Sequence, residues 1–215
     1  MRVLYLHGFG SSASSSKATF FGKKLREEAG ITLETPDFNE PDFPTLTVTR
    51  MVDQVVGILD ANPEAGRTVL IGSSLGAFVA VQVAVARPGL VQSLILLAPA
   101  LDFSDAGLRG PGGADVAEWK RAGSLNVFHY GYGRMMPIHY GLYEDARRFD
   151  AMHARLDTPT LVFQGRHDTA VDAVTVERWS RARPNVEFHL LDDDHQLTAS
   201  VDYIWREMKR VLKLY

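Results

Sequence analysis

The sequence predicts an α/β fold in which a parallel β-sheet is covered by helices on both faces. Short apolar runs rich in β-branched residues alternate along the 215-residue chain with longer segments whose apolar residues recur at helical spacing. The strand-like runs are apolar throughout rather than alternately polar, which is typical of strands buried in a parallel sheet. The length fits a single domain with a large continuous core.

Each element has a local signal in the sequence. A helix is expected over residues 17–29, because Ser15 or Ser16 suits its N-cap and Gly30 its end. Apolar residues at helical spacing predict a second helix over 48–59, and a long apolar stripe predicts a closing helix over 201–212. A strand over 68–71 leads through Gly72 into a helix over 75–87. The other expected strands are residues 3–6, 31–35, 91–97, 160–164 and 186–191.

About sixty residues between the strands that end near Leu97 and begin at Thr160 break this alternation. They contain a Gly/Pro-rich loop at 107–113 and two aromatic-rich runs, 125–130 and 135–140, that predict a hairpin. An insertion of this size is more often a functional lid than a simple connection. We therefore expect residues 1–100 and 158–215 to form one core, and residues 101–157 to form a lid within the same domain.

Composition narrows the classes of partner. The 23 Lys and Arg against 26 Asp and Glu give a net charge of −3 without a long basic run, which argues against nucleic acid or an anionic membrane as partner. The chain has no cysteine, so thiol catalysis and thiolate metal sites are excluded. No segment has the length of a membrane span or the pattern of a signal peptide, so we expect a cytoplasmic protein. No histidine pair has metal-ligand spacing, so we expect neither metal nor cofactor.

The pentapeptide Gly72-Ser73-Ser74-Leu75-Gly76 is a G-x-S-x-G motif between a predicted strand and a predicted helix. Such a turn requires small residues, since the backbone approaches itself and the serine holds a strained conformation. It exposes the hydroxyl at a helix N-terminus, where N–H groups favour developing negative charge. The motif indicates that Ser74 is a nucleophile, although glycines and serines also cap ordinary strand–helix junctions.

Two further loops after strands carry candidate partners for Ser74. Asp168 follows the strand 160–164, and although it could instead cap a helix, Asp172 is better placed for that role. His195 follows the last strand, after three aspartates that lack the ligand spacing of a calcium loop. The order Ser74, Asp168, His195 is that of the α/β-hydrolase triad, which predicts His195 as general base and Asp168 as its orienting acid.

The loop after the first strand, His7-Gly8-Phe9, is expected to face the Ser74 turn. In this architecture the backbone N–H groups of Phe9 and Leu75 would form the oxyanion hole. His7 itself is expected to be a structural histidine whose ring is satisfied by backbone groups.

With these residues, the chain resembles the α/β-hydrolase superfamily over essentially its whole length. The run from Leu4 to Ser12 and the Gly72–Gly76 turn are similar to those of small bacterial esterases and of acyl-protein thioesterase-like members. The first parallel strand begins almost at Met1, so the resemblance implies a sheet of about six parallel strands, without the two antiparallel strands that open the full superfamily core. It further implies carboxylesterase or thioesterase activity through an acyl-enzyme, on a small-molecule acyl substrate.

Several alternatives stay open at this stage. The same triad could serve a C–C hydrolase or an aminopeptidase, or the chain could be a non-catalytic binding protein on this fold; dehalogenases and epoxide hydrolases require Asp in place of Ser74. The substrate's acyl chain length and the oligomeric state are not predicted. Aromatic and methionine side chains of the lid could line an acyl pocket, or could equally pack the hairpin onto the core: Phe103, Phe128, Tyr130, Met135, Met136 and Tyr140.

Overall fold

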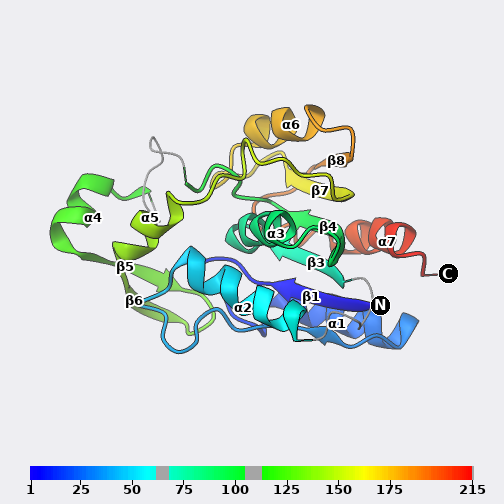
Figure 1. Cartoon of the computed structure of the whole chain (residues 1–215), viewed down its shortest axis with the longest axis horizontal. Coiled ribbons are helices and arrows are strands. Elements are labelled where there is room, and N and C mark those ends of the chain that lie inside the picture. The colour runs from blue at the N-terminus through cyan, green and yellow to red at the C-terminus, as the bar shows by residue number, and fades with distance from the viewer. Residues whose placement is uncertain (62–67, 105–112, 215) are drawn as a thin grey trace.

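The computed structural model describes residues 1–61, 68–104 and 113–214. Within these residues, six parallel strands form one sheet in the order β2-β1-β3-β4-β7-β8 (Figure 1). This confirms the predicted fold class and number of strands. The strands are β1 (Arg2–Leu6), β2 (Leu33–Glu34), β3 (Thr68–Ser73), β4 (Val91–Leu97), β7 (Thr160–Gly165) and β8 (Val186–Leu191).

Helices cover both faces of the sheet, as the apolar strands require. Alternate residues of each strand point to opposite faces, so Val3 and Tyr5 of β1 pack under α1 (Ser16–Ala29) and α7 (Val201–Leu212), whereas Leu4 and Leu6 lie in the cluster formed with helices of the opposite face. Those helices are α2 (Val48–Asp60), α3 (Leu75–Ala86) and α6 (Ala173–Arg181).

The predicted helix ends agree with the structure. The hydroxyl of Ser15 accepts a hydrogen bond from the N–H of Ala18 at the start of α1, and Gly30 ends the helix in a left-handed conformation (φ 66°). Asp172 caps α6 by accepting from the N–H groups of Val174 and Thr175. Asp172 therefore fills the capping role that the sequence assigned to it.

A hairpin and two helices that follow β4 and precede β7 lie at one end of the molecule, away from the two termini (Figure 1). The predicted hairpin is present, one residue earlier than expected at each strand, as antiparallel β5 (Ser124–His129) and β6 (Arg134–His139). Two short helices that the sequence did not predict flank it, α4 (Val116–Ala122) and α5 (Gly141–Ala146). The predicted Gly/Pro loop lies outside the described residues except for Gly113.

Strand register brings the functional loops to one edge of the sheet. Leu6 of β1 pairs with Gly72 of β3, and Ser73 of β3 pairs with Leu97 of β4. Gly165 of β7 pairs with Leu191 of β8. Because all strands are parallel, their carboxyl ends share this edge, where ligands bind in open α/β sheets.

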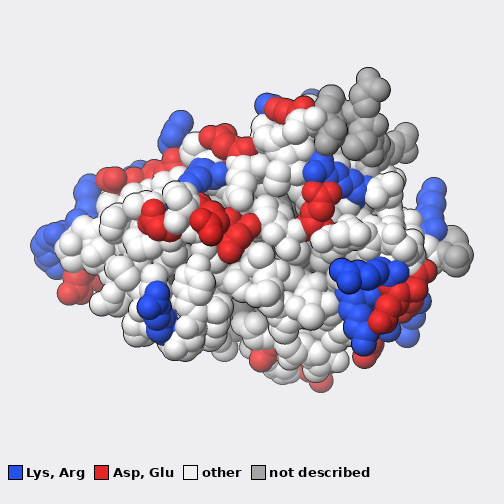
Figure 2. Space-filling view, turned by 90° about the horizontal axis from the view of Figure 1, so that it is seen from below, with Lys and Arg blue, Asp and Glu red and all other residues white. Residues whose placement is uncertain are grey.

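On the face shown in Figure 2, Lys and Arg side chains lie near Asp and Glu side chains, and uncharged residues cover most of the surface. Among the described residues, no helix combines the length and apolar character needed to cross a membrane.

Candidate active site

Ser74 lies in a strained turn between β3 and α3. Its backbone has φ 53°, in the region that residues with a side chain rarely adopt, and its N–H donates to the carbonyl of Leu97 at 2.9 Å. Its carbonyl accepts from the N–H groups of Ala77 and Phe78, in the first turn of α3. The turn therefore places Ser74 immediately before the helix N-terminus, and its side chain is partly exposed.

The two glycines of the motif are required by close backbone contacts. A Cβ on Gly76 would lie 2.1 Å from the carbonyl oxygen of Leu6, and one on Gly72 would lie 2.5 Å from Cα of Ala77. Neither neighbour is a flexible side chain, so no larger residue fits without moving backbone. The glycines of this motif thus allow α3 to begin directly against β1 and β3.

The loop after β1 lies on the Ser74 turn, as predicted. A Cβ on Gly8 would lie 3.3 Å from Cβ of Ser74, so the two loops are in contact. Within the described residues, the N–H groups of Phe9 and Leu75 donate to no acceptor. Two free N–H groups on either side of a serine are the arrangement that an oxyanion hole requires.

Asp168 and His195 are hydrogen-bonded, with 2.8 Å between Oδ2 of the acid and Nδ1 of the ring. The Asp168 side chain is fully buried, and its carboxylate also accepts from Gln164 Nε2 at 2.9 Å and from the N–H groups of Ala170 and Val171 at 2.8 Å. Burial alone would raise the pKa of Asp168, but the hydrogen bonds outweigh it and the pKa lies below its ordinary value. The carboxylate is therefore ionised, and the ring carries its proton on Nδ1.

Sequence reasoning missed Lys17, which supports the loop that carries His195. Lys17 is 7% exposed, and its Nζ donates to the carbonyl of Gln196, the next residue after His195, at 2.8 Å. Burial lowers the pKa of Lys17, and the nearby carboxylates of Asp194, Asp193 and Asp168 oppose that effect. The only sequence signal was its position on the buried face of α1, one residue before Ala18.

The third contact of a triad is not formed in this structure. Among the described residues, neither the hydroxyl of Ser74 nor Nε2 of His195 has a hydrogen-bond partner. Both groups are partly exposed at the same edge of the sheet, which carries Ser74 after β3 and His195 after β8. Catalytic hydrogen bonds of this type are often long before substrate binds.

A hollow of about 530 Å³ lies between Phe9 and the hairpin, and we call it the hairpin hollow. Among the described residues its lining has no charged side chain. Three of the predicted pocket residues line it, and of these Tyr130 and Met135 are 75% and 57% exposed. The lining side chains that extend from the hairpin are Leu125, Asn126, Val127, Phe128, Tyr130 and Met135.

Phe103 and Tyr140 lie elsewhere. Phe103 packs edge-on against Phe78 of α3, with ring centroids 5.9 Å apart, and Tyr140 packs edge-on against Trp119 of α4 at 5.5 Å. Met136 is a partly buried residue that packs onto the core. A second hollow, of about 440 Å³, lies at the opposite edge of the sheet, near Val91 and Pro159, away from these residues.

Among the described residues, one group has the spacing of metal ligands, namely Glu187, His189 and Glu207. Arg210 already occupies the position of a cation there, because it forms ion pairs with both glutamates. The chemistry of this group is therefore that of a surface ion-pair network.

Comparison with known proteins supports the fold. A model of the uncharacterised protein family UPF0227 matches residues 2–212, whereas no curated protein matches the chain. Among solved structures, Est1E from Butyrivibrio proteoclasticus with bound ferulic acid is similar with a TM-score of 0.85 at 16% identity, over 99% of this chain and 88% of that one.

Two further structures have the same architecture. The mouse alpha/beta hydrolase domain-containing protein 10 is similar with a TM-score of 0.77 at 22% identity, over 99% of this chain and 90% of that one. The monoacylglycerol lipase of Paleococcus ferrophilus has a TM-score of 0.74 at 16% identity, over 98% and 93%. The chain therefore has the α/β-hydrolase fold.

Proposed function

We propose that this chain, which belongs to the uncharacterised protein family UPF0227, is a serine hydrolase that cleaves carboxylic ester or thioester bonds of small to medium acyl substrates. The observation that carries the proposal is the hydrogen bond between buried Asp168 and His195, at the sheet edge that also carries the strained Ser74 turn. An imidazole held by a carboxylate beside a serine at a helix N-terminus is the arrangement required for acyl transfer.

In the proposed reaction, His195 removes the proton from Ser74 as the serine oxygen attacks the acyl carbon. Asp168 keeps the ring proton on Nδ1, so the lone pair of Nε2 is available as a base. The N–H groups of Phe9 and Leu75 stabilise the tetrahedral oxyanion, and losing one such donor typically costs about 2.7–4 kcal/mol. His195 then protonates the leaving alcohol or thiol, and water activated by the same ring hydrolyses the acyl-enzyme.

The hairpin hollow is the proposed acyl-binding site. Its lining is uncharged and, apart from Asn126 and the hydroxyl of Tyr130, has apolar side chains; it includes Phe9, whose N–H is a proposed oxyanion donor. Phe128, Tyr130 and Met135 would contact the acyl group there. Bound ferulic acid in Est1E and the name of the monoacylglycerol lipase are consistent with apolar or aromatic acyl groups on this fold, but they describe those proteins.

Steady-state hydrolysis of p-nitrophenyl esters and the matching acyl thioesters, from acetyl to octanoyl, tests the proposal. We expect turnover by the wild-type protein, and a loss of kcat by several orders of magnitude in Ser74→Ala with an unchanged melting temperature. Ser73→Ala is the matched control, because Ser73 is the buried neighbour of Ser74 in the same turn. Full activity in Ser74→Ala would refute the proposal, and absence of any turnover in wild type would favour a binding protein or another reaction.

A further inference from the structure

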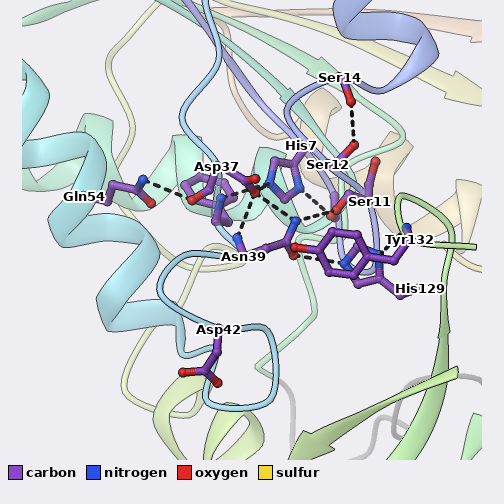
Figure 3. A network of polar contacts seen from close by, with 12 residues as sticks. His7, Ser11, Ser12, Ser14, Asp37, Asn39, Asp42, Gln54, His129 and Tyr132 are labelled. Atoms are coloured by element: carbon purple, nitrogen blue, oxygen red, sulfur yellow. Dashed lines mark hydrogen bonds and ion pairs between the residues drawn. The ribbon is translucent and has the colours of Figure 1, made fainter. Parts of the chain in front are cut away.

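A network of polar side chains joins the hairpin to the loops after β1 and β2 (Figure 3). Its hydrogen bonds run from Asp37 through Asn39 to His129, with the ring of His7 in contact with Asp37 at 3.3 Å, and all but Asp37 are nearly or fully buried. None of these side chains takes part in the proposed reaction. The network therefore requires its own explanation.

Hydrogen bonds to backbone groups fix the proton on each histidine ring. His7 Nε2 accepts from the N–H of Phe38 at 3.0 Å, so its proton lies on Nδ1, which donates to the carbonyl of Gly8 at 3.0 Å. His129 Nδ1 accepts from the N–H of Tyr132 at 3.1 Å, so its proton lies on Nε2. The two neutral rings thus have opposite tautomers.

Asn39 connects three segments of the chain. Its Oδ1 accepts from His129 Nε2 at 3.0 Å, and its Nδ2 donates to Asp37 Oδ1 at 2.8 Å and to the carbonyl of Ser11 at 2.9 Å. Every polar atom of this amide is paired, and the residue is 4% exposed. Because both an acceptor and a donor are used, neither Asp nor a rotated amide makes the same set of bonds.

The segments that Asn39 joins form two walls of the hairpin hollow. The N–H of Gly131 at the hairpin tip donates to the carbonyl of Gly10, just after Phe9. The ring of Phe43 contacts both Phe9, at 5.4 Å between centroids, and His129, at 4.6 Å. These contacts and the hydrogen bonds of Asn39 together join the tip of the hairpin to the loop of Phe9.

We propose that Asn39 is a positioning residue that, through His129, holds the hairpin tip against the loop of Phe9 and so sets which acyl groups the hairpin hollow accepts. The holding role stands on the geometry alone, and the effect on acyl choice rests on the proposed function.

The test compares Asn39→Asp with Asn185→Asp. Asn185 also donates two amide hydrogen bonds to carbonyls, those of Leu156 and Thr158, but it lies at the amino end of β8. For Asn39→Asp we expect the ratio of kcat/KM for p-nitrophenyl octanoate over acetate to change by about tenfold, mainly through KM for octanoate. For Asn185→Asp we expect no change in the ratio. Equal ratios in both variants, with similar losses of melting temperature, would overturn the effect on acyl choice.

Two measurements test the holding role without ester turnover. In wild type, nitrogen NMR of the imidazoles should show the Nε2–H tautomer for His129 and Nδ1–H for His7, and the opposite tautomer in either ring would overturn the network. Hydrogen exchange at Gly131, Tyr132 and Gly133 should be faster in Asn39→Asp than in Asn185→Asp. Equal exchange would overturn the holding role, whereas a wild-type protein without esterase activity would refute the proposed function, and with it the effect on acyl choice, but not the holding role.

Discussion

Replacing Asp168 by Asn tests the proposed triad at its buried member. The amide can keep its oxygen toward the N–H groups of Ala170 and Val171, which places its NH₂ against Gln164 and His195. Rotating the amide instead leaves both backbone donors facing an NH₂ group. Each buried donor left without an acceptor costs about 1–3 kcal/mol.

The first orientation is favoured, because His195 can move its proton to Nε2, and Gln164 Nε2 keeps its longer hydrogen bonds to the carbonyls of Gly165 and Val171. This orientation costs at most about 1–3 kcal/mol of stability, whereas the rotated amide leaves the part-buried N–H of Val171 and the exposed N–H of Ala170 facing an NH₂ group. The first orientation also removes the lone pair that accepts the proton of Ser74. The same substitution lowers kcat about 10⁴-fold in a serine protease triad, and we expect a loss of that order.

The assay is kcat for a p-nitrophenyl ester alongside the melting temperature. Asp172→Asn is the control, since Asp172 caps α6 with the same residue type and lies only four positions away. Asn and Asp cap helices about equally well, so we expect it to lose only the charge interaction with the helix N-terminus, about 0.3–1 kcal/mol, and to keep its activity. A kcat of Asp168→Asn within about tenfold of wild type would refute the assigned role, because a His195 ring with its proton on Nε2 instead of Nδ1 should lower kcat far more than that.

Two further predictions concern buried cations and histidines. Lys17→Met should lower kcat and destabilise the protein by about 1–3 kcal/mol, because the carbonyl of Gln196 loses its buried donor. Lys23→Met is the control, since Lys23 is exposed. Equal kcat in the two variants would refute the role of Lys17. Burial lowers the pKa of His7 and His129 below 6.5, so the unfolded chain binds protons first as pH falls. The free energy of unfolding should therefore be maximal above pH 6.5 and decrease below it, by up to about 1.4 kcal/mol per pH unit for each histidine. Denaturant unfolding between pH 7.5 and about 5 measures this slope, which His129→Gln should reduce; an unchanged slope would contradict the assignment.

Local sequence signals were sufficient for the sheet and for the loops of the candidate triad. The strand 68–71 is rich in β-branched residues, and the glycines of the Ser74 motif lie where a Cβ would come within 2.1 and 2.5 Å of neighbouring backbone. Asp168 could be distinguished from a helix-capping residue because Asp172 is better placed in the sequence to cap the following helix, α6. Chain order alone then indicated that Asp168 and His195 meet.

Contacts between distant segments were not predictable in this way. Asn39 and His129 are 90 positions apart, and Lys17 and Gln196 are 179 apart, so no local pattern reports either pair. The two helices beside the hairpin have six and seven residues, too short for a clear periodic pattern. Phe103 and Tyr140 were predicted to line a pocket because they are aromatic, but residue type alone does not reveal that they pack against Phe78 and Trp119.

Intact-mass analysis of the protein after reaction with a fluorophosphonate tests the proposed nucleophile most directly. The reagent forms a covalent phosphonyl ester with an activated serine as fluoride leaves. The experiment therefore requires no knowledge of the natural substrate or of the preferred acyl group. We predict a single adduct on Ser74 in wild type and in Ser73→Ala, and none in Ser74→Ala. An unlabelled wild-type protein, or an adduct that persists in Ser74→Ala, would contradict the assignment of Ser74 as an activated nucleophile.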